Sequence, residues 1–124
     1  MQITRQSSPD RQLVQRYGNG GFRVSGTDYA GSVIVTVPAT LSWRATSMAG
    51  ITLDDFAPLI ALVGALDVCL LGCGPTMMPL PKDIRLALKD AGLTIDPMYT
   101  GAACRTYNVL MGEGRAVVAA LIAI

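Results

Sequence analysis

Histidine is absent from this 124-residue sequence, and aromatic residues make up only 6% of it. Without histidine, the Ser-His-Asp and Cys-His catalytic arrangements, the usual imidazole bases and most zinc sites are excluded. Because aromatics are scarce, Val, Ile, Leu, Ala and Met must fill the core. The residues therefore predict no metal site, no cofactor and no complete catalytic constellation.

Charged residues are also few, at 15% of the sequence, and the ten basic and nine acidic side chains leave a net charge of +1. A net charge this small predicts that the protein binds neither nucleic acid nor an anionic membrane. The N-terminal region is mildly basic, through Arg5, Arg11, Arg16 and Arg23. These arginines fit either a solvated edge strand or a docking surface for an acidic partner.

Hydrophobic residues reach 51%, which predicts a packed globule rather than a disordered chain. We expect a loose N-terminal leader over residues 1–10 and one α/β domain over 11–124. No secretory signal follows Met1, and Pro58, Gly64 and Asp67 interrupt the longest apolar stretch, so no transmembrane segment is predicted. A cytoplasmic location follows, and the odd count of three cysteines argues against a disulfide framework.

The first third of the chain has the pattern of an antiparallel meander. Residues 13–17 and 22–25 alternate on either side of Gly18-Asn19-Gly20-Gly21, which predicts a β-hairpin. Residues 26–31 indicate a second turn. A β-branched run over 32–37 and an alternating segment around Leu41 and Trp43 predict two more strands.

From residue 51 onward the pattern changes to helices alternating with strands. A helix is expected over 56–64, with Asp54 or Asp55 as its cap. Two further helices, 82–91 and 101–111 with Thr100 as cap, alternate with strands at 66–71, 93–98 and 115–122. This β-α-β-α-β order predicts parallel strands and places the bend at residues 72–74 close to the start of the last helix.

Gly72-Cys73-Gly74 directly follows a buried strand, where ligands often bind in α/β proteins. It is not a dinucleotide fingerprint, because Met77 stands where the third glycine belongs and Pro75 disturbs the turn. The bend is therefore either a ligand site or a tight strand exit at which glycine avoids a clash.

Cys104 lies in the first turn of the predicted last helix, next to Arg105. Both the helix dipole and the neighbouring cation lower a thiol pKa, which favours a nucleophile. The sequence offers no histidine to act as the general base for this thiol, however, and the alternative is that Cys104 is a buried structural thiol.

Polar residues continue along this helix and past its end: Arg105, Asn108, Glu113 and Arg115. One interpretation is a cluster that holds an anionic group or the backbone of a partner. The other is that these side chains bond to backbone groups and fix the turn from helix to strand.

Several segments resemble a known family: Gly26, Tyr29-Ala-Gly-Ser32, Trp43, the run 67–74, and above all Ala103-Cys-Arg-Thr-Tyr-Asn108 with Glu113-Gly-Arg115. Over residues 13–122 the chain resembles the family catalogued as domain of unknown function 498, which includes a mitochondrial respiratory complex I assembly factor. It departs from the family pattern at Cys73, where Thr is usual, and at Gly112, where a small helix former is more typical.

The resemblance implies a three-layer β/β/α fold in which two sheets pack together and helices cover one face. It implies no established catalytic residues. It also implies a non-catalytic interaction domain, with respiratory or membrane-protein subunits as partners, that assists assembly or membrane insertion of complex I-like complexes. Such a protein would be peripheral to the inner membrane through its partners, and apolar edges make a homodimer an open alternative. The rival hypothesis is a small-molecule- or anion-binding protein or enzyme, with its site between Gly72-Cys73-Gly74 and Cys104-Arg105.

Overall fold

The computed structural model describes residues 11–124, so the predicted leader lies outside the described residues. Its elements follow in chain order: β1 Val14–Gly18, β2 Gly21–Val24, β3 Thr27–Ala30, β4 Val33–Thr36, β5 Thr40–Ser42, η2 Met48–Gly50, η3 Leu53–Phe56, α1 Ala57–Ile60, β6 Val68–Gly72, α2 Lys82–Asp90, β7 Ile95–Met98, α3 Thr100–Gly112 and β8 Val117–Leu121. The mixed α/β class and the β-α-β-α-β order of the second half are confirmed.

The N-terminal strands form a small antiparallel sheet in the order β1-β2-β3. The predicted hairpin is present, and its turn places Asn19 and Gly20 at φ 53° and 77°, as a two-residue type I′ turn requires. The predicted turn over 26–31 is wrong, because residues Thr27–Ala30 form β3. A second two-residue turn at Ser25 and Gly26, both at positive φ, reverses the chain earlier than expected.

The predicted single meander is also wrong, since the strands after Gly31 belong to another sheet. That five-stranded sheet has the order β5-β4-β8-β6-β7. β6 pairs in parallel with both β7 and β8, whereas β4 runs antiparallel to β8. The C-terminal strand β8 therefore lies in the middle of the sheet and joins the two halves of the chain.

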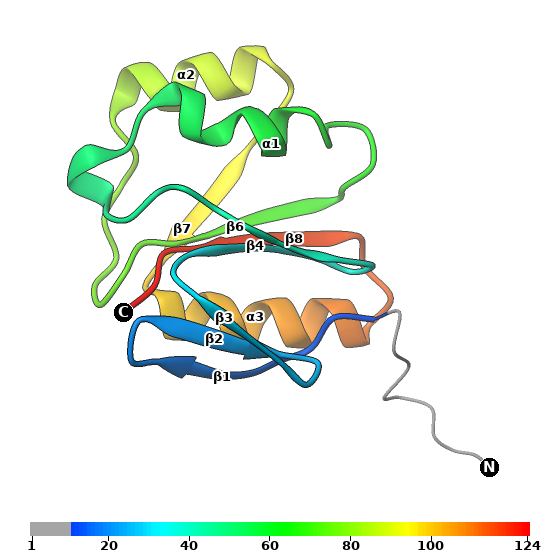
Figure 1. Ribbon diagram of the computed structural model, residues 1–124. Coiled ribbons are helices and arrows are strands. Elements are labelled where there is room, and N and C mark those ends of the chain that lie inside the picture. The colour runs from blue at the N-terminus through cyan, green and yellow to red at the C-terminus, as the bar shows by residue number, and fades with distance from the viewer. Residues whose placement is uncertain (1–10) are drawn as a thin grey trace.

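The helices divide between the two faces of this sheet (Figure 1). β6 leads through α2 to β7 on one side, and β7 leads through α3 to β8 on the other side of β6. Right-handed crossovers that run in opposite directions place their helices on opposite faces. α1 and α2 thus cover one face, while α3 lies with the small sheet on the other. The resemblance implied that helices cover only one face of the sheet, and α3 on the opposite face corrects this expectation.

The first predicted helix is shorter than expected and differently capped. Residues 53–56 are 3₁₀ and α1 spans only Ala57–Ile60. The N-cap is Thr52 rather than an aspartate, and the buried Asp55 carboxylate accepts bonds from the Thr52 N–H at 2.8 Å and from Arg44 Nε at 2.7 Å. Burial alone would raise the pKa of Asp55, but these bonds and the Arg44 charge outweigh it and lower the pKa.

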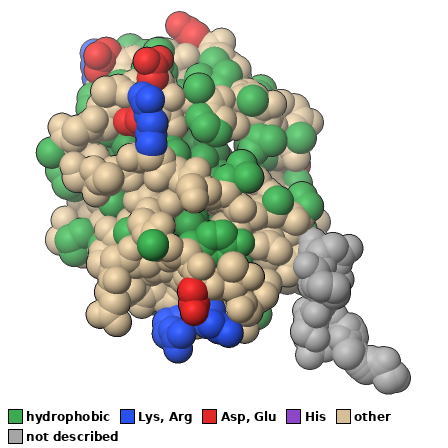
Figure 2. Space-filling view, viewed as in Figure 1, with side chains coloured by type: hydrophobic (Ala, Val, Ile, Leu, Met, Phe, Trp, Pro, Cys, Tyr) green, Lys and Arg blue, Asp and Glu red, His purple; other side chains and the backbone are tan. Residues whose placement is uncertain are grey.

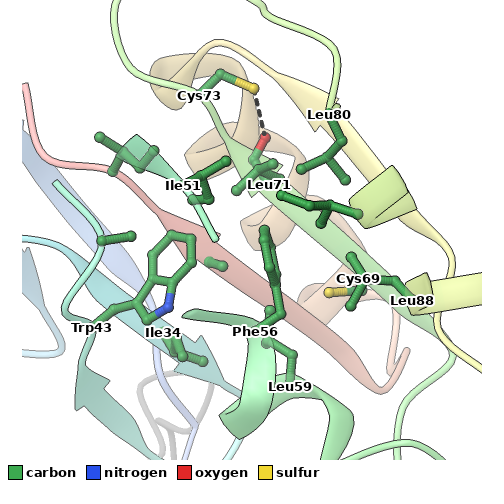
Figure 3. Close-up of a cluster of buried hydrophobic side chains, with 14 of the residues drawn as sticks. Ile34, Trp43, Ile51, Phe56, Leu59, Cys69, Leu71, Cys73, Leu80 and Leu88 are labelled. Carbon is green, nitrogen blue, oxygen red and sulfur yellow. Dashed lines mark hydrogen bonds between the residues drawn. The ribbon is translucent and has the colours of Figure 1, made fainter. Parts of the chain in front are cut away.

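Apolar side chains form one core cluster on each face of the five-stranded sheet. Figure 3 shows the cluster under α1 and α2, in which Trp43 and Phe56 meet edge to face at 5.8 Å between ring centroids. The other cluster joins α3 to β2 through Tyr107, Phe22 and Val24. Each fully buried large apolar side chain stabilises the fold by about 1.5–3 kcal/mol.

Candidate functional site

The carboxyl ends of the central strands meet the start of α3 at one closed set of hydrogen bonds. Thr100 N donates to Gly74 O at 2.8 Å, and Gly74 N donates to Thr100 Oγ1 at 2.9 Å. The Thr100 hydroxyl donates in turn to Ile122 O at 2.8 Å, and Ile122 N donates to Gly72 O at 3.0 Å. The predicted proximity of the 72–74 bend to the last helix is therefore confirmed.

Both glycines of the bend have structural reasons to be glycine. A Cβ at Gly72 would lie 3.0 Å from Thr100 Oγ1 and 3.1 Å from Thr100 Cα. Gly74 has φ +106°, which other residues rarely adopt. Because the polar backbone atoms named above bond to one another, this arrangement supports the tight-exit interpretation of Gly72-Cys73-Gly74.

Thr100 is not the helix cap that the sequence predicted. Tyr99 occupies the N-cap position, and Thr100 is the first helical residue, fully buried. Its hydroxyl ties α3 to the ends of β6 and β8 instead of closing the helix. Capping and cross-linking use the same side-chain type, so the local sequence could not separate them.

Cys104 faces the core below α3, with 3% of its surface exposed. Burial raises the pKa of its thiol to about 12, although the Arg105 charge partly opposes the shift. Cys69 and Cys73 are also buried, and burial raises their pKa values as well. A neutral, buried thiol fits the structural interpretation of Cys104 better than the nucleophile.

Arg105 points outward and belongs to a cluster with two tyrosines. Its guanidinium donates to Tyr99 Oη and lies 5.6 Å above the centre of the Tyr99 ring. Tyr17, from β1, packs against Gly101, where a Cβ would come within 2.5 Å of the phenol oxygen. Neither tyrosine was predicted from the sequence. No local signal could reveal Tyr17, because it is distant from Arg105 in the chain, whereas Tyr99 lies only six residues before Arg105.

Asn108 is occupied by the backbone of β1. Its Oδ1 accepts from Val14 N at 3.0 Å, and its Nδ2 donates to Val14 O at 2.8 Å. The side-chain amide thus pairs with Val14 as a neighbouring strand would. Of the two interpretations of the polar residues on this helix, the structural one holds for Asn108.

Glu113 and Arg115 lie at the other end of α3, exposed to solvent. The helix runs from residue 100 to residue 112, about 18 Å at 1.5 Å per residue. Near them, Asp67 Oδ2 accepts from Ala116 N at 3.2 Å where β8 begins. The predicted polar residues therefore divide into Cys104, Arg105 and Asn108, which lie within α3 on the side of β1, and Glu113 and Arg115, which lie beyond the end of the helix.

An open hollow of about 310 Å³ lies between β1 and α3. Arg16 and Tyr17 line it from the strand, and Cys104, Arg105 and Asn108 line it from the helix. Within residues 11–124, no three His, Cys, Asp or Glu side chains come together as a metal site. The same part of the chain contains no helix that is both long and apolar enough to cross a bilayer.

Residues 14–122 match the model of a family described as protein of unknown function DUF498/DUF598. The chain belongs to this family. The predicted resemblance is therefore confirmed, and the Ala103-Cys-Arg-Thr-Tyr-Asn108 segment that carries it lies in the middle of α3.

Two proteins similar in sequence to this chain are an uncharacterized bacterial protein and a vertebrate assembly factor. An uncharacterized protein of Rhodobacter capsulatus is 38% identical over 109 residues, which are 88% of this chain and 82% of that protein. The NADH dehydrogenase (ubiquinone) 1 alpha subcomplex assembly factor 3 of Danio rerio is 30% identical over 110 residues, 89% of this chain. The matched part is 63% of the Danio rerio protein, so this chain spans less than two thirds of that relative.

The fold is shared with a solved structure from Bartonella henselae, described as that of an outer membrane protein. The two agree with a TM-score of 0.84 at 36% sequence identity, and the match covers 93% of this chain and 97% of the other. Likeness over nearly the full length of both chains shows that the two-sheet arrangement is common to them.

Proposed function

We propose that this protein is a non-catalytic interaction domain that assists the assembly of a respiratory NADH dehydrogenase of the complex I type. The observation that carries the proposal is the 30% identity to assembly factor 3 of Danio rerio across 89% of this chain. The step we assign to it is the docking or membrane insertion of subunits. Those subunits would hold it at the cytoplasmic face of the inner membrane.

The chemistry of the candidate residues supports binding rather than catalysis. A general acid or base needs a proton or lone pair that can reach a substrate. The Thr100 hydroxyl and the Asn108 amide are bonded to backbone groups. The Cys104 thiol is buried, with its pKa raised to about 12. Arg105 and the tyrosines beside it remain as an outward surface that a partner can contact.

Gene deletion in the native host tests the assembly function. We expect the deletion strain to lose fully assembled complex I on native gels and to accumulate subassemblies, together with lower NADH:quinone activity. Wild-type protein restores assembly, and so does Cys104→Ala, because no chemistry depends on the thiol. Immunoblots verify that the variant is as abundant as wild type.

Two results would contradict the proposal. If the deletion strain assembles complex I normally and affinity purification recovers no respiratory or membrane subunit, the assembly function is wrong. If a stable, abundant Cys104→Ala protein fails to restore assembly, the non-catalytic part is wrong.

A further inference from the structure

The edge of β1 that faces α3 has no neighbouring strand among the described residues. β1 is an outer strand of the small sheet, and the Val14 N–H and C=O groups point toward α3, where Asn108 binds both. In the type I′ hairpin, Gly18 and Gly21 form the hydrogen-bonded pair next to the turn. Since such pairs alternate, Tyr17 opposite Phe22 is a non-hydrogen-bonded pair, and its backbone groups also point outward.

The neighbouring strand supports this register. The turn at Ser25 and Gly26 makes Val24 and Thr27 the hydrogen-bonded pair between β2 and β3. Alternation then directs the Phe22 backbone groups toward β3 and away from β1. The outward side of Tyr17 is therefore free within the part of the chain that the structure describes, three residues beyond the point where Asn108 already imitates a paired strand.

The same hollow is positively charged. Arg16 and Arg105 both line it, and neither β1 nor α3 contains an acidic residue. Basic side chains gather at the end of the molecule formed by β1, β2 and β3, where Arg23 is paired with Asp28 at 2.9 Å (Figure 2). Arg105 donates to an uncharged phenol instead, so its full charge is available to a ligand.

We propose that the hollow between β1 and α3 binds an extended, acidic segment of a partner protein, which pairs with the outward backbone groups of Tyr17 and places carboxylates against Arg16 and Arg105. A strand edge supplies main-chain bonds that hold an extended peptide, and side-chain contacts supply the preference for sequence. Arg16 and Arg105 line a hollow whose own lining contains no acidic residue, and arginines select carboxylates, which they bind through bidentate bonds. This inference rests on the proposed function as an interaction domain and names the kind of partner segment it takes.

A displayed library of random short peptides tests the proposal without requiring the identity of the partner. We expect selection on the wild-type protein to enrich peptides rich in Asp and Glu. Those peptides should bind Arg16→Glu/Arg105→Glu about tenfold more weakly, since like charges then meet. Arg85→Glu/Lys89→Glu on α2 carries the same change in net charge on the opposite face and should bind as wild type does.

Amide hydrogen exchange separates strand pairing from simple attraction of charge. The selected peptide should slow exchange at the Tyr17 amide, whereas inorganic phosphate or glutarate should not. Selection of peptides without acidic residues, equal loss of binding in both double variants, or binding that leaves the Tyr17 amide unprotected would overturn the proposal. If affinity purification with Arg16→Glu/Arg105→Glu still recovers respiratory subunits, the hollow between β1 and α3 is not the binding site, while the assembly function stands.

Discussion

The Thr100 side chain joins three segments of the candidate site. Its hydroxyl accepts from Gly74 and donates to Ile122, so it connects the ends of β6 and β8 to the start of α3. A buried backbone N–H or C=O without a partner costs about 1–3 kcal/mol. The identity of this residue therefore affects the stability of the whole carboxyl edge.

Replacement of Thr100 by valine keeps the shape and removes both side-chain bonds. We expect Thr100→Val to lower the free energy of unfolding by about 2–4 kcal/mol, because it leaves Gly74 N and Ile122 O unpaired. Thr100→Ser keeps the hydroxyl and should cost about 1 kcal/mol, close to the value of one buried methyl group. Urea unfolding measures both, and an equal loss in the two variants would show that the hydroxyl contributes nothing.

Cys104 should behave as a slow thiol. With a pKa of about 12, its thiolate fraction near pH 8 is about one ten-thousandth. We expect iodoacetamide to label Cys104 roughly a hundredfold more slowly in the native protein than in urea, as located by mass spectrometry of the labelled peptide. Because its folded pKa is raised, the associated stability is present below about pH 8.5 and is lost as the pH rises toward 12. Rapid native labelling would restore the nucleophile hypothesis.

At the level of elements, the sequence predicted those with strong periodicity and missed those fixed by distant contacts. The amphipathic α2 and the strands β6, β7 and β8 fall within a few residues of their predicted positions. The helix predicted at 56–64 is shorter because residues 61–64 form turns instead of continuing α1. Before α1, Thr52 and Asp55 hold a 3₁₀ turn that Arg44 and Trp43 bind from another segment. β3 was taken for a turn because its residues, Thr27-Asp-Tyr-Ala30, become a strand only through pairing with β2.

The candidate site divides in the same way. Sequence order and crossover topology sufficed to bring Gly74 near Thr100 at the start of α3. They could not show that β1 packs beside α3. A bulge between Val14 and Arg16 also changes which β1 side chains share a face, so simple alternation assigned them wrongly. Asn108 and Tyr17 therefore acquire their contacts only in three dimensions.

Three glycines in or beside β6 and α3 can be replaced to test at which positions the fold requires glycine. Gly72→Ala should destabilise the protein by about 1–3 kcal/mol, because the new methyl group would press on Thr100. Gly74→Ala should cost about 1–3 kcal/mol through its positive φ. Gly112→Ala, in open space near the end of α3, is the matched control and should be neutral or stabilise by up to about 1 kcal/mol. Equal effects at Gly72 and Gly112 in thermal unfolding would contradict the close approach of β6 to α3.

For the whole molecule, the five-stranded sheet lies between two core clusters and belongs to both. Strands β4, β6 and β8 direct alternate residues into each cluster, as with Cys69 and Leu71 on one face and Leu70 on the other. Loss of packing on either face should therefore destabilise the same strands. We expect residues 11–124 to unfold as one cooperative unit.

A substitution in the small sheet, followed by a probe on the other side of the molecule, tests that unit. Val24 is 1% exposed in the cluster of α3 and β2, whereas the single tryptophan, Trp43, lies in the cluster of α1 and α2. Val24→Ala should lower the free energy of unfolding by roughly 2 kcal/mol. Trp43 fluorescence and far-ultraviolet circular dichroism should report the same shift in urea midpoint, because a two-state protein gives coincident transitions. A Trp43 transition that stays at the wild-type midpoint while the circular dichroism shifts would show that the small sheet and α3 unfold separately from the rest.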